Sequence, residues 1–214
     1  MTPRISNDAE LLERWRHGDQ AAGEMLFERY YVQVERFFIN KVGPDIDDLI
    51  QETFAACVTS RERLADASRF RSYLFAVAYR VLFGYLRTKY RRQPFVDLEQ
   101  VSVRDLAPGQ GTIEAGRAEQ RLLLEALRSL PVTGQVLIEL HYWERLTTTE
   151  MAEVLGIPLG TVRGRLRRAR GQLGEVLGQL EASPGRLATT FSNLDDWAAR
   201  CRDRAARPAA DRRT

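Results

Sequence analysis

Apolar residues in this chain recur every three or four positions, and almost every patterned segment has the spacing of an amphipathic helix. No segment shows the convincing alternation of a strand. An Asn-x-x-Glu capping box opens the first helix, Asp19 caps the second, and Ser68 caps the fourth. The pattern predicts four helices in the first part of the chain, over about 8–17, 20–41, 46–58 and 69–92.

Residues 93–112 hold two prolines, two glycines and scattered acids without helical spacing, which predicts a flexible linker. Four more helices are predicted after it, over about 113–129, 132–144, 148–155 and 159–181. The fold class is therefore all-α, with two small helical domains over 1–92 and 113–182. The Arg-, Ala- and Pro-rich tail, 183–214, is expected to be partly disordered.

Composition and charge narrow the possible functions. The net charge is only +3, but residues 8–62 hold twelve acids against six bases, while 80–92 and 158–173 each hold five bases and no acid. Charge sorted into blocks indicates different surfaces for different partners. The longest apolar run, 73–79, is far too short for a membrane span, and the first residues lack a signal-peptide core.

Nothing in the sequence resembles an active site or a metal centre. Cys57 and Cys201 lie 144 positions apart and are expected to be free thiols in a reducing cytosol. Neither His17 nor His141 has partners at ligand spacing, and no nucleophile–base arrangement stands out. We therefore predict a non-enzymatic, cytoplasmic protein without cofactor or metal.

The sharpest local signal is a helix-turn-helix pattern over 147–173. Thr147 and Glu150 form a capping box, Gly156 suits a helix end, and Pro158 suits the next helix start. The second helix is far more basic than the first, as in DNA-binding helix-turn-helix motifs. Its apolar residues are Val162, Leu166 and Ala169, and its arginines are left for bases or phosphates: Arg163, Arg165, Arg167, Arg168 and Arg170.

Two other helical faces carry possible chemistry. One face of the 69–92 helix interleaves aromatics with arginines, which suits unpaired nucleic acid: Tyr79, Arg80, Phe83, Arg87, Tyr90 and Arg91. The alternative is that some of these rings pack under neighbouring helices. The stripe of the same helix that is expected to be buried consists of Phe70, Leu74, Val77, Ala78, Val81 and Tyr85.

The 46–58 helix has an acidic face formed by Asp47, Asp48, Gln51 and Glu52, which is either a solvated surface or a dock for a basic protein. Its apolar side is expected to consist of Ile46, Leu49, Ile50, Phe54, Cys57 and Val58.

In this order, the three segments resemble the bacterial RNA polymerase sigma factors of the extracytoplasmic-function (ECF) type, in the sigma-70 family. Residues 47–54 resemble region 2.2, which docks on a coiled coil of the polymerase β′ subunit. Residues 70–92 resemble regions 2.3 and 2.4, which melt and read the −10 promoter element. Residues 130–170 resemble region 4, which reads the −35 element, and the linker matches the family's lack of a region 3 domain.

The resemblance implies a factor that directs core RNA polymerase to promoters and is controlled by an anti-sigma partner. It assigns polymerase docking to the acidic face and −10 DNA binding to the aromatic and arginine face. It assigns −35 DNA binding to Leu159, Gly160, Thr161, Arg163, Arg165, Arg167 and Arg168.

Two other readings compete with this one. A stand-alone helix-turn-helix regulator of duplex operators would leave the acidic face and the aromatic face unexplained. A helical adaptor with basic faces for acidic proteins would bind with little dependence on salt, unlike a protein that binds phosphates.

Overall fold

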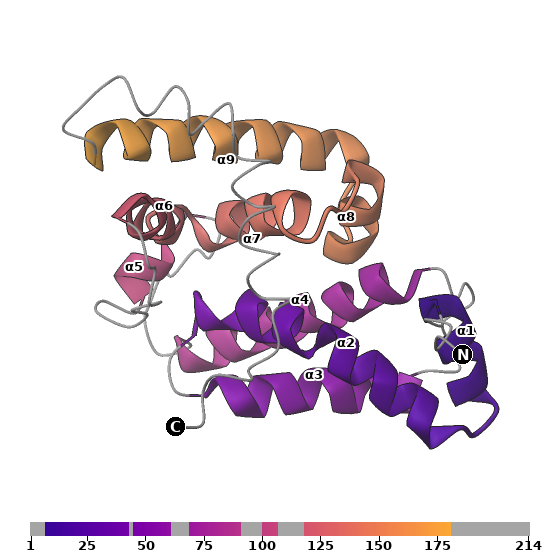
Figure 1. Cartoon of the computed structure of the whole chain (residues 1–214). Coiled ribbons are helices and arrows are strands. Elements are labelled where there is room, and N and C mark those ends of the chain that lie inside the picture. Colours follow the sequence, from indigo (N-terminus) through magenta and orange to yellow (C-terminus); the bar gives the residue numbers. More distant parts are fainter. Residues whose placement is uncertain (1–6, 43–44, 61–68, 91–99, 107–117, 181–214) are drawn as a thin grey trace. The chain divides into compact units, whose positions relative to one another are not determined.

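The computed structural model describes residues 7–42, 45–60, 69–90, 100–106 and 118–180, and most of these residues lie in helices (Figure 1). They belong to two compact units: one comprises Met1–Val96 and Ala152–Ile157, and the other comprises Asp97–Met151 and Pro158–Thr214. The predicted tail, 183–214, lies outside the described residues.

The first unit consists of α1 (Asp8–Arg16), α2 (Gln20–Ile39), α3 (Ile46–Ser60) and α4 (Phe70–Lys89). The two predicted caps at its start are confirmed: Asn7 accepts a hydrogen bond from the Glu10 amide at 2.8 Å, and Asp19 accepts one from the Ala22 amide at 3.2 Å. Ser68, the predicted cap of the fourth helix, lies outside the described residues.

A glycine sets the approach of α1 to α2. A Cβ atom on Gly23 would lie 2.6 Å from Nε1 of Trp15, so any larger residue would displace the Trp15 ring. The Trp15 ring packs edge-on against Phe27, whose ring lies 4.6 Å from that of Phe54 on α3. The core of the unit is therefore built around rings from several helices, and α4 packs against α1, α2 and α3.

The second unit contains α5 (Val103–Leu106), α6 (Ala118–Arg128), α7 (Val132–Tyr142) and α9 (Leu159–Leu180). Helix α8 (Thr148–Leu155) precedes α9 in the chain and is divided between the two units. Helix α9 packs against α6 and α7 and buries Val162, Leu166, Ala169, Leu173 and Leu177 (Figure 1). The predicted bounds of α8 are confirmed, and those of α7 and α9 are confirmed to within two residues.

The prediction of one unstructured linker over 93–112 is wrong for residues 100–106. The Val132 amide donates to the Val101 carbonyl at 3.0 Å, Ser102 forms a β-bridge with Pro131, and the Val103 side chain is buried. These contacts attach the segment to the start of α7. Helical spacing could not reveal them, because α5 is a single short turn held by tertiary contacts.

Candidate functional site

The acidic face of α3 is exposed as predicted. Asp47, Asp48, Gln51 and Glu52 are all exposed, while Leu49, Ile50, Thr53 and Cys57 are buried. The buried Thr53 hydroxyl is satisfied, because it donates to the Leu49 carbonyl at 2.8 Å. Val58, predicted on the apolar side, is instead 39% exposed. The surface of α3 therefore combines acids near its start, favourable at a helix N-terminus, with an apolar side chain near its end.

Asp45 precedes this face and has a different environment. Its carboxylate accepts a hydrogen bond from the Tyr85 hydroxyl at 2.7 Å, and the Lys89 ammonium donates to the same hydroxyl at 2.6 Å. Burial, followed by the Asp45 carboxylate, raises the pKa of Tyr85 above its usual value. The hydroxyl therefore stays protonated and links the start of α3 to the last turn of α4.

Helix α4 presents fewer aromatics to solvent than the sequence predicted. Arg80 and Arg87 are exposed, and Tyr79 and Tyr90 are half-buried. Phe83, however, is only 7% exposed, and its ring lies 4.4 Å from that of Tyr79. The prediction that Phe83 lies on an exposed face is therefore wrong.

The reason is the central position of α4, which packs against three helices and needs a broad apolar arc. Phe75, Leu82 and Leu86 are buried beside Phe83, outside the predicted stripe. Tyr85, predicted within that stripe, is half-exposed. Arg91 lies outside the described residues.

The helix-turn-helix geometry is confirmed in detail. The Glu150 amide donates to the Thr147 hydroxyl at 3.2 Å, and the Thr147 amide donates to the Glu150 carboxylate at 2.7 Å, completing the capping box. Gly156 has φ of +65°, in the left-handed region that favours glycine. The Val162 amide donates to the Pro158 carbonyl at 3.1 Å, which begins α9.

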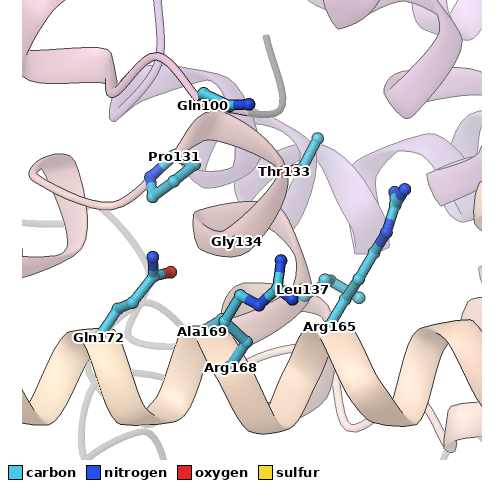
Figure 2. Close-up of a pocket in the computed structure, with 9 residues that line it drawn as sticks. All are labelled: Gln100, Pro131, Thr133, Gly134, Leu137, Arg165, Arg168, Ala169 and Gln172. Atoms are coloured by element: carbon cyan, nitrogen blue, oxygen red, sulfur yellow. The ribbon is translucent and has the colours of Figure 1, made fainter. Parts of the chain in front are cut away.

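The arginines of α9 lie on two flanks of the helix. Arg163, Arg167 and Arg170 line a cavity of about 200 Å³ together with Thr148, and the Arg170 guanidinium lies 5.9 Å from the centre of the Tyr142 ring. The other two, Arg165 and Arg168, line a separate cavity of about 370 Å³ beside the start of α7 (Figure 2).

The remaining −35 residues named from the sequence lie in the first turn of α9. Leu159 and Thr161 are half-buried, and Gly160 is exposed. The arginines of α9 were predicted to form one basic face, and the position of two of them beside α7 was not predicted. Their spacing could have indicated two sides of the helix, because residues two positions apart lie about 200° apart around the helix axis.

Other chemistry is sparse in the described part of the chain. No group of three or more metal-ligating side chains occurs there, and none of its helices is long and apolar enough to cross a membrane. Cys57 is a free thiol, and its burial raises its pKa to about 12, which keeps it unreactive. Cys201 lies outside the described residues.

Comparison with known proteins shows the family of this chain. Residues 26–92 match the family described as sigma-70 region 2, and residues 120–173 match the family described as sigma-70, region 4. The ECF RNA polymerase sigma-E factors of Salmonella typhimurium and Escherichia coli K12 are each 30% identical to this chain over 172 residues. Those residues cover 76% of this chain and 90% of each relative.

Two solved structures have a similar fold. CnrH, in complex with the cytosolic domain of CnrY, matches 81% of this chain and 99% of its own, with a TM-score of 0.60 and 25% identity. The sigma factor RpoE of Bartonella quintana, in complex with the anti-sigma factor NepR, matches 74% and 98%, with a TM-score of 0.58 and 19% identity. Fold, sequence and matched regions together show that this chain belongs to the ECF sigma factors of the sigma-70 family, which direct RNA polymerase to promoters.

Proposed function

We propose that three surfaces of this chain divide the work of promoter recognition. The acidic face of α3 docks on core RNA polymerase, through Asp47, Asp48, Gln51 and Glu52. The surface of α4 and the residues that follow it receive the unpaired −10 strand, through Tyr79, Arg80, Arg87 and Tyr90 and through Arg91, which lies outside the described residues. The first half of α9 enters the major groove of the −35 element, through Leu159, Gly160, Thr161, Arg163, Arg165, Arg167 and Arg168.

The observation that carries this proposal is the separation of charge between exposed faces. The acids of α3 face solvent over a buried apolar side. On α9, Arg163, Arg167, Arg168 and Arg170 face solvent over another buried apolar side, and Arg165 is half-buried. A protein that binds both a polymerase and DNA needs separate surfaces for them. The exposed acidic face of α3 suits the polymerase, and the basic recognition helix suits DNA.

The proposed cycle uses no chemistry by this chain itself. The factor acts in the cytoplasm, binds core polymerase, reads duplex DNA at −35 and captures single-stranded DNA at −10, without cofactor and without catalysis. The chain between α4 and α6, which contains the predicted linker, sets the distance between the two DNA sites. Because CnrH and RpoE were solved with CnrY and NepR, we also propose that an anti-sigma protein controls this chain.

The polymerase-docking role is tested by reversing charge on α3. Asp48→Arg or Glu52→Arg should weaken retention on immobilised core RNA polymerase at least about tenfold, since opposite charges across an interface steer and hold partners. Helical content should stay unchanged, because both side chains are exposed.

The matched control is Glu24→Arg, an exposed acid on α2 outside the acidic face. It should be retained like the unaltered chain. Equal retention of all variants would remove the assigned role of the acidic face.

The competing duplex regulator predicts a different result in transcription. With core polymerase and genomic DNA, the full chain should produce discrete promoter-specific transcripts, whereas an operator-binding regulator should produce none. Tight binding to a duplex without polymerase, combined with no initiation, would favour the regulator.

A further inference from the structure

Helices α3 and α4 are tied to each other near both ends by tyrosine hydroxyls of α4. At one end, the Tyr85 hydroxyl donates to the carboxylate of Asp45, just before α3, at 2.7 Å. At the other end, the hydroxyls of Tyr73 and Ser60, the last residue of α3, are hydrogen-bonded to each other. The start of each helix therefore lies beside the end of the other, and the pair is antiparallel.

The apolar contact between these helices sets their register less sharply than the two ties do. Leu49, Ile50 and Cys57 of α3 are buried, and burial of apolar area stabilises without a preferred direction. A hydrogen bond, in contrast, requires its donor and acceptor to lie within a narrow range of distance and angle. The hydroxyl ties therefore fix how far α3 lies along α4.

The tie at Tyr85 lies between two surfaces of the proposed function. Asp45 comes two residues before Asp47, the first acid of the docking face, and Tyr85 comes two residues before Arg87, on the helix proposed to receive the −10 strand. The Lys89 ammonium donates to the Tyr85 hydroxyl at 2.6 Å and lies 5.0 Å from the centre of the ring. The hydroxyl thus joins a carboxylate of one helix to an ammonium of the other.

This tie is too weak to decide whether the unit folds. Asp45 and Lys89 are exposed and Tyr85 is half-exposed, so water competes for all three groups. The net contribution of one such hydrogen bond changes an equilibrium by about threefold to tenfold. A factor of this size is enough to favour one alignment of two surfaces over others.

We propose that Tyr85 is a positioning residue for promoter opening. By holding Asp45, its hydroxyl fixes the acidic face of α3 relative to the end of α4. Polymerase bound to α3 then holds the −10 surface of α4 in the position in which the unpaired strand is captured. This inference rests on the proposed roles of α3 and α4, and it adds the residue that couples them.

The first experiment tests the tie itself in the full chain. Tyr85→Phe keeps the ring and removes only the hydroxyl, so the first turn of α3 loses its anchor. The Leu49 amide, which donates to the Asp45 carbonyl at 3.3 Å, should then exchange with solvent about threefold to tenfold faster in NMR hydrogen exchange. The Ala22 amide, bonded to the Asp19 cap of α2, should exchange as in the unaltered chain.

The second experiment tests promoter opening. Holoenzyme containing Tyr85→Phe should form closed complexes like the unaltered factor, and the variant should be retained equally on core polymerase, because no proposed contact residue is changed. Permanganate reactivity of −10 thymines should fall about threefold to tenfold, the most that one such tie can contribute. Tyr31→Phe, which removes the hydroxyl of an exposed tyrosine on α2, should leave all three measurements unchanged.

Variants of Asp45 separate the tie from a direct contact of Tyr85 with DNA. Asp45→Ala should impair opening as much as Tyr85→Phe does, and the double variant should lose no more than either single variant. Asp45→Asn should keep most of the opening, because its amide oxygen still accepts a hydrogen bond. Additive losses would mean that Tyr85 acts independently of Asp45, and they would overturn the proposal.

Each combination of results decides the proposal. Faster exchange at Leu49 together with impaired opening and unchanged polymerase retention supports it. Unchanged exchange, or faster exchange with normal opening, overturns it. Equal loss of retention, closed complexes and opening, with a lower unfolding temperature, would show a role in stability alone and would also overturn it.

Failure of the proposed function remains separate. Promoter-specific initiation by the unaltered chain, with normal opening by Tyr85→Phe, would defeat this inference alone. If the unaltered chain is not retained on core polymerase and produces no promoter-specific transcripts, the proposed function fails, whatever the exchange rates show.

Discussion

Helices α4 and α9 are the two helices assigned to DNA, and they pack in different ways. Helix α9 buries five residues on one side of its 22 residues, whereas α4 buries ten of its 20. Helical periodicity therefore predicts well which side chains of α9 are exposed. In α4, half of the residues are buried within the unit, so periodicity predicts exposure less well. A helix covered on one side shows its binding chemistry in its sequence, and a helix covered on most sides does not.

Phe83 and Arg167 show this difference most clearly. Each lies on the side of its helix away from the apolar stripe predicted from the sequence. Phe83 is nevertheless buried, whereas Arg167 is exposed. Burial of an aromatic ring stabilises the fold, so the ring packs under any neighbouring helix that can cover it. Burial of an arginine is unfavourable because the guanidinium loses its hydration. Aromatic residues on a helical face are therefore weaker evidence for stacking on bases than arginines are for phosphate contacts.

The largest expected effect is on stability. Phe83→Ala should destabilise the protein by about 3–5 kcal/mol, because it removes a buried ring and leaves a cavity beside Tyr79. Urea unfolding followed by circular dichroism measures this loss. A loss within about 0.5 kcal/mol, typical of surface changes, would mean that Phe83 is available to DNA after all.

Substitution of the half-buried tyrosines should impair promoter opening without impairing binding of the closed complex. Tyr79→Ala and Tyr90→Ala should each weaken capture of an unpaired base by about 1–3 kcal/mol, the contribution of stacking on one aromatic side chain. Permanganate reactivity of −10 thymines should fall, while gel-shift binding of closed complexes should persist.

Tyr31, an aromatic 43% exposed on α2, is the matched control, and Tyr31→Ala should leave both measurements unchanged. A template with a pre-melted −10 bubble should rescue only part of the loss in Tyr79→Ala. Equal loss in both assays would indicate that the tyrosines support the fold instead of the strand.

Substitutions on α9 should affect DNA binding and leave stability nearly unchanged, unlike the substitution of Phe83. Arg163→Ala should leave stability nearly unchanged, because the side chain is exposed. A base-reading arginine should lose about 1–3 kcal/mol of binding and relax preference at one position, whereas a phosphate contact should weaken all −35 sequences alike.

Competition binding over a set of −35 variants measures both features. Arg145→Ala, an exposed arginine before α8, is the control in the same unit and should bind like the unaltered chain. Unchanged binding of Arg163→Ala at low salt would contradict the assignment of α9 as the recognition helix.

The smallest expected effect comes from substitution of Gly164, which should raise stability and lower −35 affinity. Gly164 is exposed on α9, with no atom within 4 Å of where a Cβ would lie. Gly164→Ala should therefore stabilise the helix by up to about 1 kcal/mol, while hindering close approach of the backbone to DNA. Thermal unfolding and −35 binding should move in opposite directions.

An increase in both stability and −35 affinity would show that the backbone of α9 does not approach the DNA closely at this position. Gly178→Ala, an exposed glycine near the end of the same helix, should stabilise without affecting binding.

The sequence by itself determined the longer helices, the caps at Asn7, Asp19 and Thr147, the helix-turn-helix and the acidic face of α3. These features depend on spacing within one segment: Asn7 caps its own helix, Thr147 and Glu150 cap each other, and Gly156 ends α8. Local hydrogen bonds and period 3.6 specify such features without reference to tertiary contacts.

The tertiary structure decided which side chains of α4 are covered, and it placed residues 100–106 against the start of α7. It also separated the α9 arginines into two flanks and set one of them beside Gly134. Phe83, Val103 and Arg168 each owe their environment to residues distant in the chain. Helical periodicity records the direction in which a side chain points, but only packing determines what lies in that direction.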